Sequence, residues 1–316
     1  MDSPVKPIDV VIIGGGPAGL SAALWCAELG LGSVLIEQER GLGGQLRHVY
    51  NPIDNYLGIR AANGLEMLSL FEKSVGSRNF VPRLGIKASS IDFAAMEVRV
   101  AGLGGHEERL SFRALILATG VRRRVLGIPG EIDFRGRGIL ESGSRDKEKV
   151  SGKRVLIIGG GDAAFENALI LSEHARTVRV AYRRAAPTAR RAFVDATKHR
   201  DNVEHISGMN ITRILGDSSV ERVESRDSSG QTRTEPIDAV LIRIGVEPNS
   251  ELVSRAVDLE ESGYIKVDHK GETSIPGVDA VGDVAHFSSP TLSTAVGTGT
   301  TAAKSIFHSI NKLKQL

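Results

Sequence analysis

Two short glycine-rich segments of this chain have the spacing of turns that bind phosphate groups. They are Gly14–Gly19 and Gly159–Ala164, and each lies between an apolar, β-branched strand and an alanine-rich helix. In that context, backbone N–H groups and the positive end of a helix can approach a pyrophosphate without obstruction by side chains. Two such turns predict two bound dinucleotides.

The position about twenty residues after each turn indicates which nucleotide it binds, because the next strand ends there beside the adenosine ribose. After the first turn this position is Glu37, whose carboxylate can accept hydrogen bonds from the ribose diol of FAD or NAD. After the second turn the strand is followed by Arg183 and Arg184, and then by Arg190 and Arg191. Paired guanidiniums bind a 2′-phosphate in forked geometry, which predicts NADP(H) at the second turn. A solvated basic face is the alternative for these arginines.

An internal repeat places both turns in the same structural context. Each turn is followed by a polar, alternating stretch suited to a β-meander, at residues 91–112 and 211–236. An apolar strand follows each stretch, at residues 114–117 and 239–242. This repeated order predicts an α/β fold with two Rossmann-like, three-layer ββα dinucleotide-binding domains.

The last part of the chain makes the first of these domains discontinuous. Two further strands are predicted at residues 265–267 and 278–283, followed by an alanine- and threonine-rich helix from about residue 291 to 310. We therefore expect an FAD-binding domain formed by residues 1–120 and 247–316. The NAD(P)H-binding domain, residues 121–246, is inserted into it.

The composition excludes several other classes of protein. With 316 residues, 25% of them charged, and a formal net charge of +2, the chain shows no demand for nucleic acid or a membrane surface. It lacks a signal peptide and any run long enough to span a bilayer, so we expect a cytoplasmic protein. The eight histidines show no ligand spacing that predicts a metal site. The single cysteine, Cys26, excludes an intrachain disulfide.

Along nearly its whole length the chain resembles the low-molecular-weight thioredoxin reductases. The resemblance rests on both glycine turns and on five further motifs, Gly43–Leu46, Ile53–Asn55, Ala118–Gly120, Gly282–Asp283 and Thr291–Leu292. It implies FAD and NADPH as cofactors and a homodimer. It also implies FAD contacts from Gly14, Gly16, Pro17, Ala18, Gly19, Glu37, Gly44, Gln45, Leu46, Asn55, Ala118, Thr119, Gly120, Gly282, Asp283, Thr291 and Leu292, and NADPH contacts from Gly161, Asp162, Ala163, Arg183, Arg184 and one of Arg190 and Arg191.

The chain departs from that family at the redox centre. Thioredoxin reductases carry a Cys-x-x-Cys pair just ahead of the second turn, whereas residues 138–146 of this chain contain no cysteine. A dithiol relay needs a thiolate that attacks a disulfide. Cys26 is in the middle of a predicted helix, where a small buried residue is expected. Reduction of thioredoxin is therefore improbable.

Three functions remain open, and none requires a catalytic acid or base in the chain. The leading one is a ferredoxin- or flavodoxin-NADP reductase of the thioredoxin-reductase type, in which flavin accepts a hydride from NADPH at N5. Arg122–Arg124, with Arg135 and Arg137, could steer its acidic carrier, or could form a solvated hinge. The alternatives are an NADPH oxidase or diaphorase that reduces oxygen or a quinone, and a non-catalytic redox sensor that binds FAD or a nucleotide.

Overall fold

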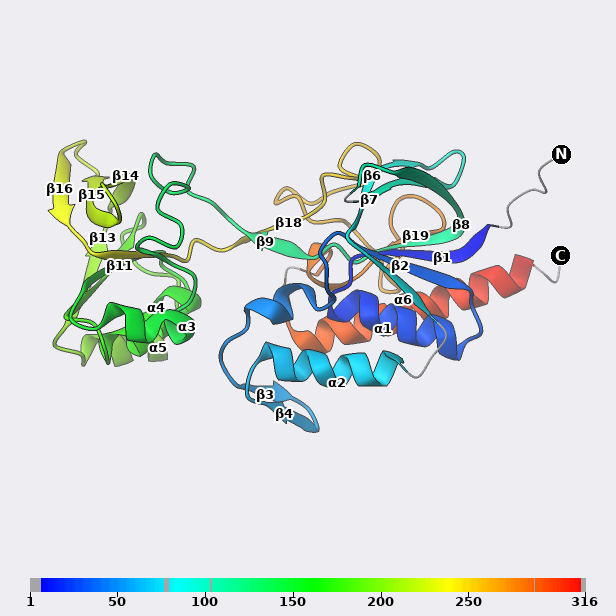
Figure 1. The fold of residues 1–316 in the computed structure, drawn as a ribbon, viewed down its shortest axis with the longest axis horizontal. Coiled ribbons are helices and arrows are strands. Elements are labelled where there is room, and N and C mark those ends of the chain that lie inside the picture. The colour runs from blue at the N-terminus through cyan, green and yellow to red at the C-terminus, as the bar shows by residue number, and fades with distance from the viewer. Residues whose placement is uncertain (1–6, 77–79, 103, 287, 314–316) are drawn as a thin grey trace. The chain divides into compact units, whose positions relative to one another are not determined.

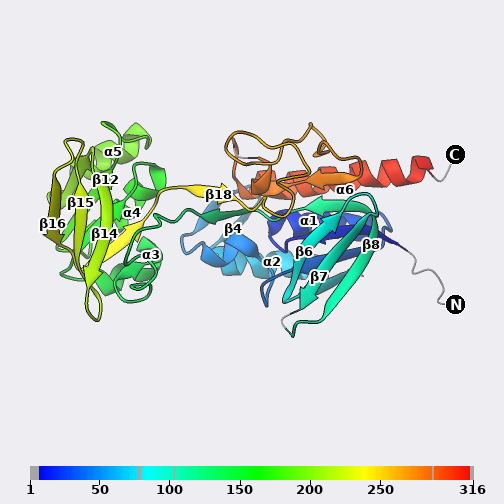
Figure 2. The same ribbon diagram turned by 90° about the horizontal axis from the view of Figure 1, so that it is seen from above.

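The computed structural model describes residues 7–76, 80–102, 104–286 and 288–313. The chain divides into two compact units (Figures 1 and 2). Unit 1 comprises Met1–Arg122 and Glu247–Leu316, and unit 2 comprises Arg123–Val246. The chain crosses between them at β9 (Val121–Arg123) and β18 (Val246–Pro248), two short strands that pair with each other. No helix within the described ranges is long and apolar enough to cross a membrane.

A seven-stranded sheet forms the centre of unit 1, in the order β5-β2-β1-β8-β7-β6, with β19 also paired to β8. Strand β1 is parallel to β2 and to β8, so that Ile13 lies level with Ile36 and Leu117. Its last four residues are buried because both faces of this central strand are covered. The strands are β1 (Ile8–Ile13), β2 (Ser33–Glu37), β5 (Val81–Leu84), β6 (Ile86–Asp92), β7 (Glu97–Gly102), β8 (Glu107–Leu117) and β19 (Val278–Ala280).

Helices cover one face of the parallel strands of this sheet (Figure 1), and its antiparallel strands β6 and β7 pack against the other face. Apolar residues of α1 and α6 pack on β1 and β8 in one core cluster, and residues of β7 and β8 contribute to a second cluster on the opposite face. A two-stranded hairpin and two 3₁₀ helices complete the unit. The elements are α1 (Pro17–Glu28), η1 (Gly44–His48), β3 (Ile53–Tyr56), β4 (Ile59–Ala61), α2 (Gly64–Gly76), η3 (Gly282–Val284) and α6 (Leu292–Leu313).

Unit 2 repeats the same three layers around a parallel sheet of order β10-β17-β11-β12-β13 (Figure 2). Helix α4 packs on one face, and the antiparallel sheet β14-β15-β16 packs on the other. The elements are β10 (Ile139–Leu140), α3 (Gly143–Asp146), η2 (Lys147–Val150), β11 (Arg154–Ile158), α4 (Asp162–Ser172), β12 (Thr177–Tyr182), α5 (Arg191–Lys198), β13 (Val203–Ser207), β14 (Asn210–Gly216), β15 (Val220–Arg226), β16 (Thr232–Pro236) and β17 (Ala239–Ile242).

The predicted α/β class with two Rossmann-like units is confirmed, and one predicted strand is wrong. Residues 265–267 do not form a strand, because Ile265 makes only an isolated bridge with Leu259. The backbone N–H of Ile265 donates to the carbonyl of Val284, and that of Lys266 donates to the carbonyl of Asp258. The backbone N–H groups of this segment therefore donate to two separate segments of the chain and do not form the ladder of a strand.

Candidate functional site

A cavity of about 860 Å³ lies in unit 1, at the carboxyl ends of β1, β2 and β8. Ligands of open α/β sheets bind at this end of the strands. Every residue predicted for the first dinucleotide lines the cavity, with the exception of Gly19. These lining residues are Gly14, Gly16, Pro17, Ala18, Glu37, Gly44, Gln45, Leu46, Asn55, Ala118, Thr119, Gly120, Gly282, Asp283, Thr291 and Leu292.

The first glycine turn has the shape that a pyrophosphate requires. A Cβ on Gly16 would meet only the Cα of Gly44, at 4.0 Å, so the backbone here is open to the cavity. Helix α1 begins at Pro17 with no side chain capping its N-terminus. The first N–H groups of a helix have no partner within the helix and carry its positive dipole end. This end of α1 therefore fits a bound phosphate group.

Gly19 has a packing role that explains its absence from the cavity. A Cβ on Gly19 would lie 1.9 Å from the carbonyl oxygen of Gly14, far inside van der Waals contact. Only glycine lets α1 approach the turn this closely.

Glu37 ties the end of β2 to the glycine turn. Its Oε2 accepts the N–H of Gly15 at 2.7 Å, and its Oε1 accepts the N–H of Glu39 at 2.8 Å. The side chain is buried, and each oxygen retains a second lone pair. The carboxylate is thus fixed in position at the cavity with acceptor capacity left for a ribose diol.

Two segments from the end of the chain complete this cavity. The N–H of Gly282 donates to Thr298 Oγ1 of α6 at 3.0 Å, which joins the turn after β19 to that helix. The next residue, Asp283, is half-buried, and burial raises the pKa of its carboxyl group. Thr291 Oγ1 accepts the N–H of Thr294 at 3.1 Å and so caps the start of α6. An anionic ligand group near this helix start gains from its dipole.

Hydrogen bonds also fix Gln45, Thr119 and Asn249 at the cavity. Asn249 is a residue that the sequence analysis missed. Gln45 Nε2 donates to the carbonyl of Val121 at 2.9 Å. Thr119 Oγ1 donates to the carbonyl of Asn249 at 2.7 Å, and Asn249 Nδ2 donates back to the carbonyl of Thr119 at 2.8 Å. Asn249 lines the cavity. Its place just after strand β18 was the available signal.

A second cavity, of about 870 Å³, lies in unit 2 at the carboxyl ends of β11, β12 and β17. It too fits a dinucleotide, because α4 begins after Gly161 without a side-chain cap, and a Cβ on Gly161 would meet only Thr188 Oγ1, at 4.0 Å. The predicted residues that line it are Gly161, Asp162, Ala163, Arg183 and Arg184.

The four arginines predicted around this cavity separate into two pairs. Arg183 and Arg184 line it with exposed side chains, and neither guanidinium is ion-paired within the described part of the chain. Arg190 and Arg191 do not line it. Arg191 is 94% exposed, and its Nε lies 3.3 Å from Asp195. Of the four predicted arginines, Arg183 and Arg184 are therefore the ones available to a 2′-phosphate in this cavity.

Arg190 instead binds the glycine turn itself. Its backbone N–H donates to Asp162 Oδ1 at 2.7 Å and its Nε donates to Oδ2 at 2.6 Å. These contacts, the backbone hydrogen bond first, hold the pKa of the Asp162 carboxyl below its usual range. The N–H groups of Thr188 and Ala189 both donate to the carbonyl of Gly160. The loop after β12 is thus fastened to the phosphate turn.

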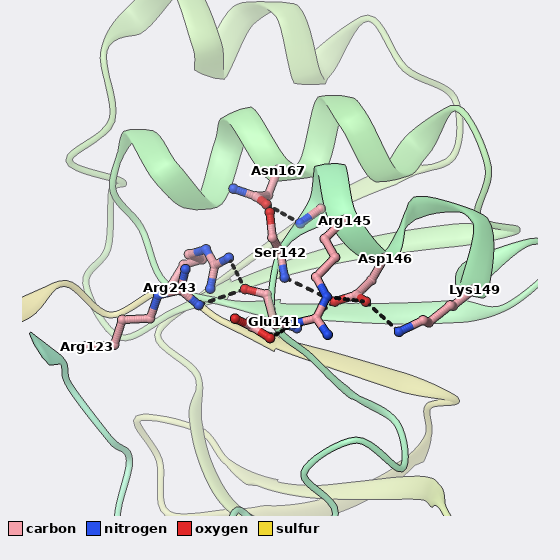
Figure 3. A network of polar contacts seen from close by, with 9 residues as sticks. Arg123, Glu141, Ser142, Arg145, Asp146, Lys149, Asn167 and Arg243 are labelled. Atoms are coloured by element: carbon pink, nitrogen blue, oxygen red, sulfur yellow. Dashed lines mark hydrogen bonds and ion pairs between the residues drawn. The ribbon is translucent and has the colours of Figure 1, made fainter. Parts of the chain in front are cut away.

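The residues in place of the cysteine pair form a polar turn (Figure 3). The buried Asp146 carboxylate accepts the N–H of Glu141 at 2.7 Å and that of Ser142 at 3.1 Å. Asn167 Oδ1 accepts the N–H of Gly143 at 2.7 Å. Hydrogen bonds to buried carboxylate and amide groups fix the backbone where a dithiol relay would need two sulfurs.

Arg243 is a second residue that the sequence analysis missed. It lines the cavity of unit 2 at the end of β17, a position typical of ligand contacts in such sheets. Its Nη1 donates to the carbonyl of Ile242 at 2.8 Å, and its Nη2 donates to the carbonyl of Glu141 at 2.6 Å (Figure 3). Arg123 Nη1 donates to the same Glu141 carbonyl at 2.7 Å. Burial, together with the nearby Arg123, lowers the pKa of Arg243 to about 10.

The remaining cysteine is unsuited to redox chemistry. Cys26 is fully buried in the core between α1 and the sheet of unit 1. Burial, and to a lesser extent the charge of Asp9, raises the pKa of its thiol to about 12. A thiol of this kind is not ionised at neutral pH and does not act as a nucleophile.

Part of the basic segment Arg122–Arg124 is neutralised by neighbouring carboxylates. Arg122 forms ion pairs with Glu247, at 2.8 Å, and with Glu251. Arg124 Nε donates to the carbonyl of Val246 at 3.0 Å. The attraction that this segment can exert on an acidic partner is therefore smaller than its sequence suggests.

Residues 8–299 match a protein-family model described as pyridine nucleotide-disulphide oxidoreductase. The chain is 31% identical over 302 residues to a 34.2 kDa protein in the rubredoxin operon of Clostridium pasteurianum, covering 94% of this chain and 96% of that protein. It is 32% identical to a thioredoxin reductase of Mycolicibacterium smegmatis, covering 93% and 94%.

A solved structure shares this architecture. The thioredoxin reductase of Lactococcus lactis in its FR conformation is 29% identical and has a TM-score of 0.83, covering 96% of this chain and 99% of that chain.

Within the residues described, no group of three or more histidine, cysteine, aspartate or glutamate side chains is arranged to hold a metal ion.

Proposed function

Because the chain belongs to the pyridine nucleotide-disulphide oxidoreductase family, we propose that it is an NADPH-dependent flavoprotein that passes electrons directly from FAD to its acceptor. FAD and NADPH are the cofactors that enzymes of this family use. We assign FAD to the cavity of unit 1 and NADPH to the cavity of unit 2.

One observation carries this proposal. The chain has a single cysteine, and that cysteine is fully buried in unit 1. A disulfide relay needs two sulfurs that can meet and exchange with a substrate disulfide. Reduction of thioredoxin through an internal dithiol is therefore excluded from the proposed activity, although thioredoxin reductases are among the relatives.

The residues of unit 1 have distinct roles in this proposal. The start of α1 and the backbone at Gly16 receive the pyrophosphate, and Glu37 accepts hydrogen bonds from the adenosine ribose. Asp283 binds the ribityl hydroxyls, and Gln45 and Asn55 lie beside the flavin. When bound, FAD accepts a hydride from NADPH and passes the electrons on. The capped start of α6 favours negative charge in this part of the cavity.

In unit 2, Arg183 and Arg184 select the nucleotide. Both are exposed at the cavity, where they can bind a 2′-phosphate that NADH lacks. The uncapped start of α4 receives the pyrophosphate. Selection therefore depends on charge at the end of β12, and general nucleotide affinity depends on the glycine turn.

For the acceptor, we propose a ferredoxin or flavodoxin as the leading candidate. Arg124 is exposed and its Nε donates to a backbone carbonyl, that of Val246, so its positive charge would attract such an acidic carrier. A small acceptor such as oxygen or a quinone is a second candidate. It is favoured by the pairing of Arg122 with Glu247 and Glu251, which reduces the charge available for steering.

Anaerobic flavin bleaching tests the proposal. The purified yellow protein is mixed with NADPH or NADH, and ferredoxin, flavodoxin, a quinone or oxygen is then added separately. Rapid bleaching that prefers NADPH, followed by reoxidation without any thiol reagent, is the expected result. The additive that restores the colour fastest identifies the acceptor class. Absence of bleaching with either nucleotide contradicts the donor site in unit 2.

Substitution of the single cysteine tests the absence of a thiol relay. We expect Cys26→Ala to reduce NADPH-driven acceptor turnover by less than about twofold, because the thiol has only a packing role. Its cost is about 1 kcal/mol of stability, since the smaller side chain leaves part of the core unfilled. Turnover per bound flavin is the measurement. A folded, FAD-loaded Cys26→Ala protein without turnover would overturn the proposal.

A further inference from the structure

Arg243 places a half-buried positive charge in the cavity of unit 2, and the phosphate contacts proposed above do not use it. Its guanidinium is fixed by two backbone carbonyls, those of Ile242 and Glu141. Arg123 donates to the same Glu141 carbonyl, so two guanidiniums converge on one acceptor (Figure 3). A carbonyl group satisfies a hydrogen bond without cancelling charge, so these two carbonyls leave the positive charge of Arg243 in place.

The order of the strands indicates which part of a dinucleotide lies near this charge. In the order β10-β17-β11-β12-β13, the glycine turn follows β11, Arg183 and Arg184 follow β12, and Arg243 follows β17 on the other side of the turn. The pyrophosphate of a bound dinucleotide lies at the glycine turn. A nucleotide whose adenosine phosphate meets Arg183 and Arg184 therefore extends its nicotinamide toward the end of β17.

The two oxidation states of the cofactor differ in charge at that end. The nicotinamide ring of NADP⁺ carries a positive charge, and the ring of NADPH is neutral. We infer that Arg243, supported by Arg123, makes the site bind the reduced cofactor in preference to the oxidised one. This inference rests on the proposed NADPH site in unit 2. It assigns to Arg243 a role in the release of NADP⁺ and in the direction of electron flow.

The charge of Arg123 acts on Arg243 more strongly than either nearby carboxylate does. Asp146 and Glu166 are the carboxylates that act on Arg243. The Asp146 carboxylate is already engaged by two backbone N–H groups and by Lys149, whose Nζ lies 2.8 Å away. Repulsion between like charges in a partly buried site changes a binding constant by about tenfold.

Binding measurements with two unreactive ligands test the inference on the whole, FAD-loaded protein. NADP⁺ has the charged ring, and 1,4,5,6-tetrahydro-NADP has a neutral ring and cannot donate a hydride. We expect the native protein to bind the neutral ligand more tightly. Arg243→Gln should lower the ratio of the two dissociation constants by about tenfold, and Arg243→Lys should preserve it. Arg176→Gln, at an exposed arginine of unit 2 outside the cavity, is the matched control and should leave the ratio unchanged.

The outcomes separate this inference from the function on which it rests. If neither ligand binds, the NADPH site itself is wrong. If both bind and Arg243→Gln weakens them by the same factor, Arg243 has only a structural role and the inference fails. Should Arg243→Gln not fold, Arg123→Gln replaces it, because Arg123 is exposed and its loss should shift the same ratio by about twofold to threefold. An unchanged ratio in that variant would overturn the inference.

Discussion

The two glycine turns share a strand-turn-helix plan but differ at their last position. In unit 1 this position is Gly19, where a Cβ would lie 1.9 Å from the carbonyl oxygen of Gly14. In unit 2 it is Ala164, whose methyl group is fully buried in the core. Unit 2 accommodates a methyl group at this position, whereas unit 1 has no room for one.

The turns also differ in how they are fastened to the strand that follows. In both units the loop after the second strand donates to the carbonyl of the turn's second glycine, from Gly43 to Gly15 in unit 1 and from Thr188 and Ala189 to Gly160 in unit 2. The side-chain contact differs, since Glu37 accepts the N–H of Gly15 in unit 1, whereas Arg190 binds Asp162 in unit 2. A carboxylate suits a ribose diol, and a loop bearing arginines suits a phosphate. The fastening thus varies with the nucleotide that each unit is proposed to bind.

Exchanging the last residue of each turn, Gly19 or Ala164, gives the largest expected difference in stability between the two units. Gly19→Ala should destabilise unit 1 by about 3 kcal/mol and abolish retention of FAD, because the new Cβ forces α1 away from the turn. Ala164→Gly should cost only about 1 kcal/mol. Flavin content after gel filtration and thermal unfolding measure both effects. Equal losses in the two variants would show that the turns are equivalent after all.

Removing the arginines of unit 2 tests the next difference. Arg183→Ala with Arg184→Ala should weaken NADPH binding by at least about tenfold, because charged hydrogen bonds to the 2′-phosphate are lost. Binding of NADH should change by less than about twofold, since it lacks that phosphate. Arg191→Ala, at a residue 94% exposed and outside the cavity, is the control. Comparable losses for both nucleotides would contradict the assignment.

The sequence was sufficient where structure is decided locally. Strand, glycine turn and helix are consecutive in the chain, so the fold class and the backbone of both phosphate turns could be predicted. The strand expected at 265–267 could not be judged in this way, because its N–H groups find partners at Val284 and Asp258, which lie elsewhere in the sequence. Local apolar pattern does not reveal a competing partner of that kind.

Side-chain pairing was the part of the sites that the sequence left open. Arg190 and Arg191 are equivalent in the sequence, and only the packing of the loop shows that Arg190 binds Asp162, which lies 28 positions away. Arg243 was missed because its neighbours in the chain form no recognisable motif. Its position directly after an apolar strand was the one usable signal.

A smaller effect is expected from the pair that fastens the second turn. Arg190→Gln should weaken NADPH and NADH alike, by about threefold to tenfold, because the unpaired Asp162 carboxylate then repels the pyrophosphate. The double variant with Asp162→Asn removes that charge and should recover affinity to within about twofold of the native protein. A loss confined to NADPH would instead mean that Arg190 binds the 2′-phosphate. Failure of the double variant to recover would reduce the pair to a structural contact.

The last expected effect is a pH dependence of stability, and it distinguishes the sheet of unit 1 from an exposed turn of unit 2. Asp279 of β19 is 2% exposed, and its Oδ1 has no hydrogen-bond partner among the described residues. Burial, followed by the charges of Glu272 and Asp268, raises the pKa of this carboxyl to about 8. The folded protein therefore holds Asp279 protonated under conditions in which the unfolded chain ionises it. The stability that Asp279 contributes is complete below about pH 4 and is lost as the pH rises toward 8.

Asp279→Asn should remove that loss. We expect the variant to exceed the native protein in stability by about 1–3 kcal/mol at pH 8 and to differ little from it at pH 4. Asp227→Asn is the opposite case, because the hydroxyl of Ser229 and two backbone N–H groups hold the pKa of Asp227 below its usual value. Its contribution is present above about pH 4 and is lost on acidification, so this variant should be less stable than the native protein at pH 6 and pH 8, with the difference shrinking toward pH 4 and below. Urea unfolding at pH 4, 6 and 8 measures both variants, and an advantage of Asp279→Asn that stays constant with pH would mean that the buried carboxyl is not protonated in the folded protein.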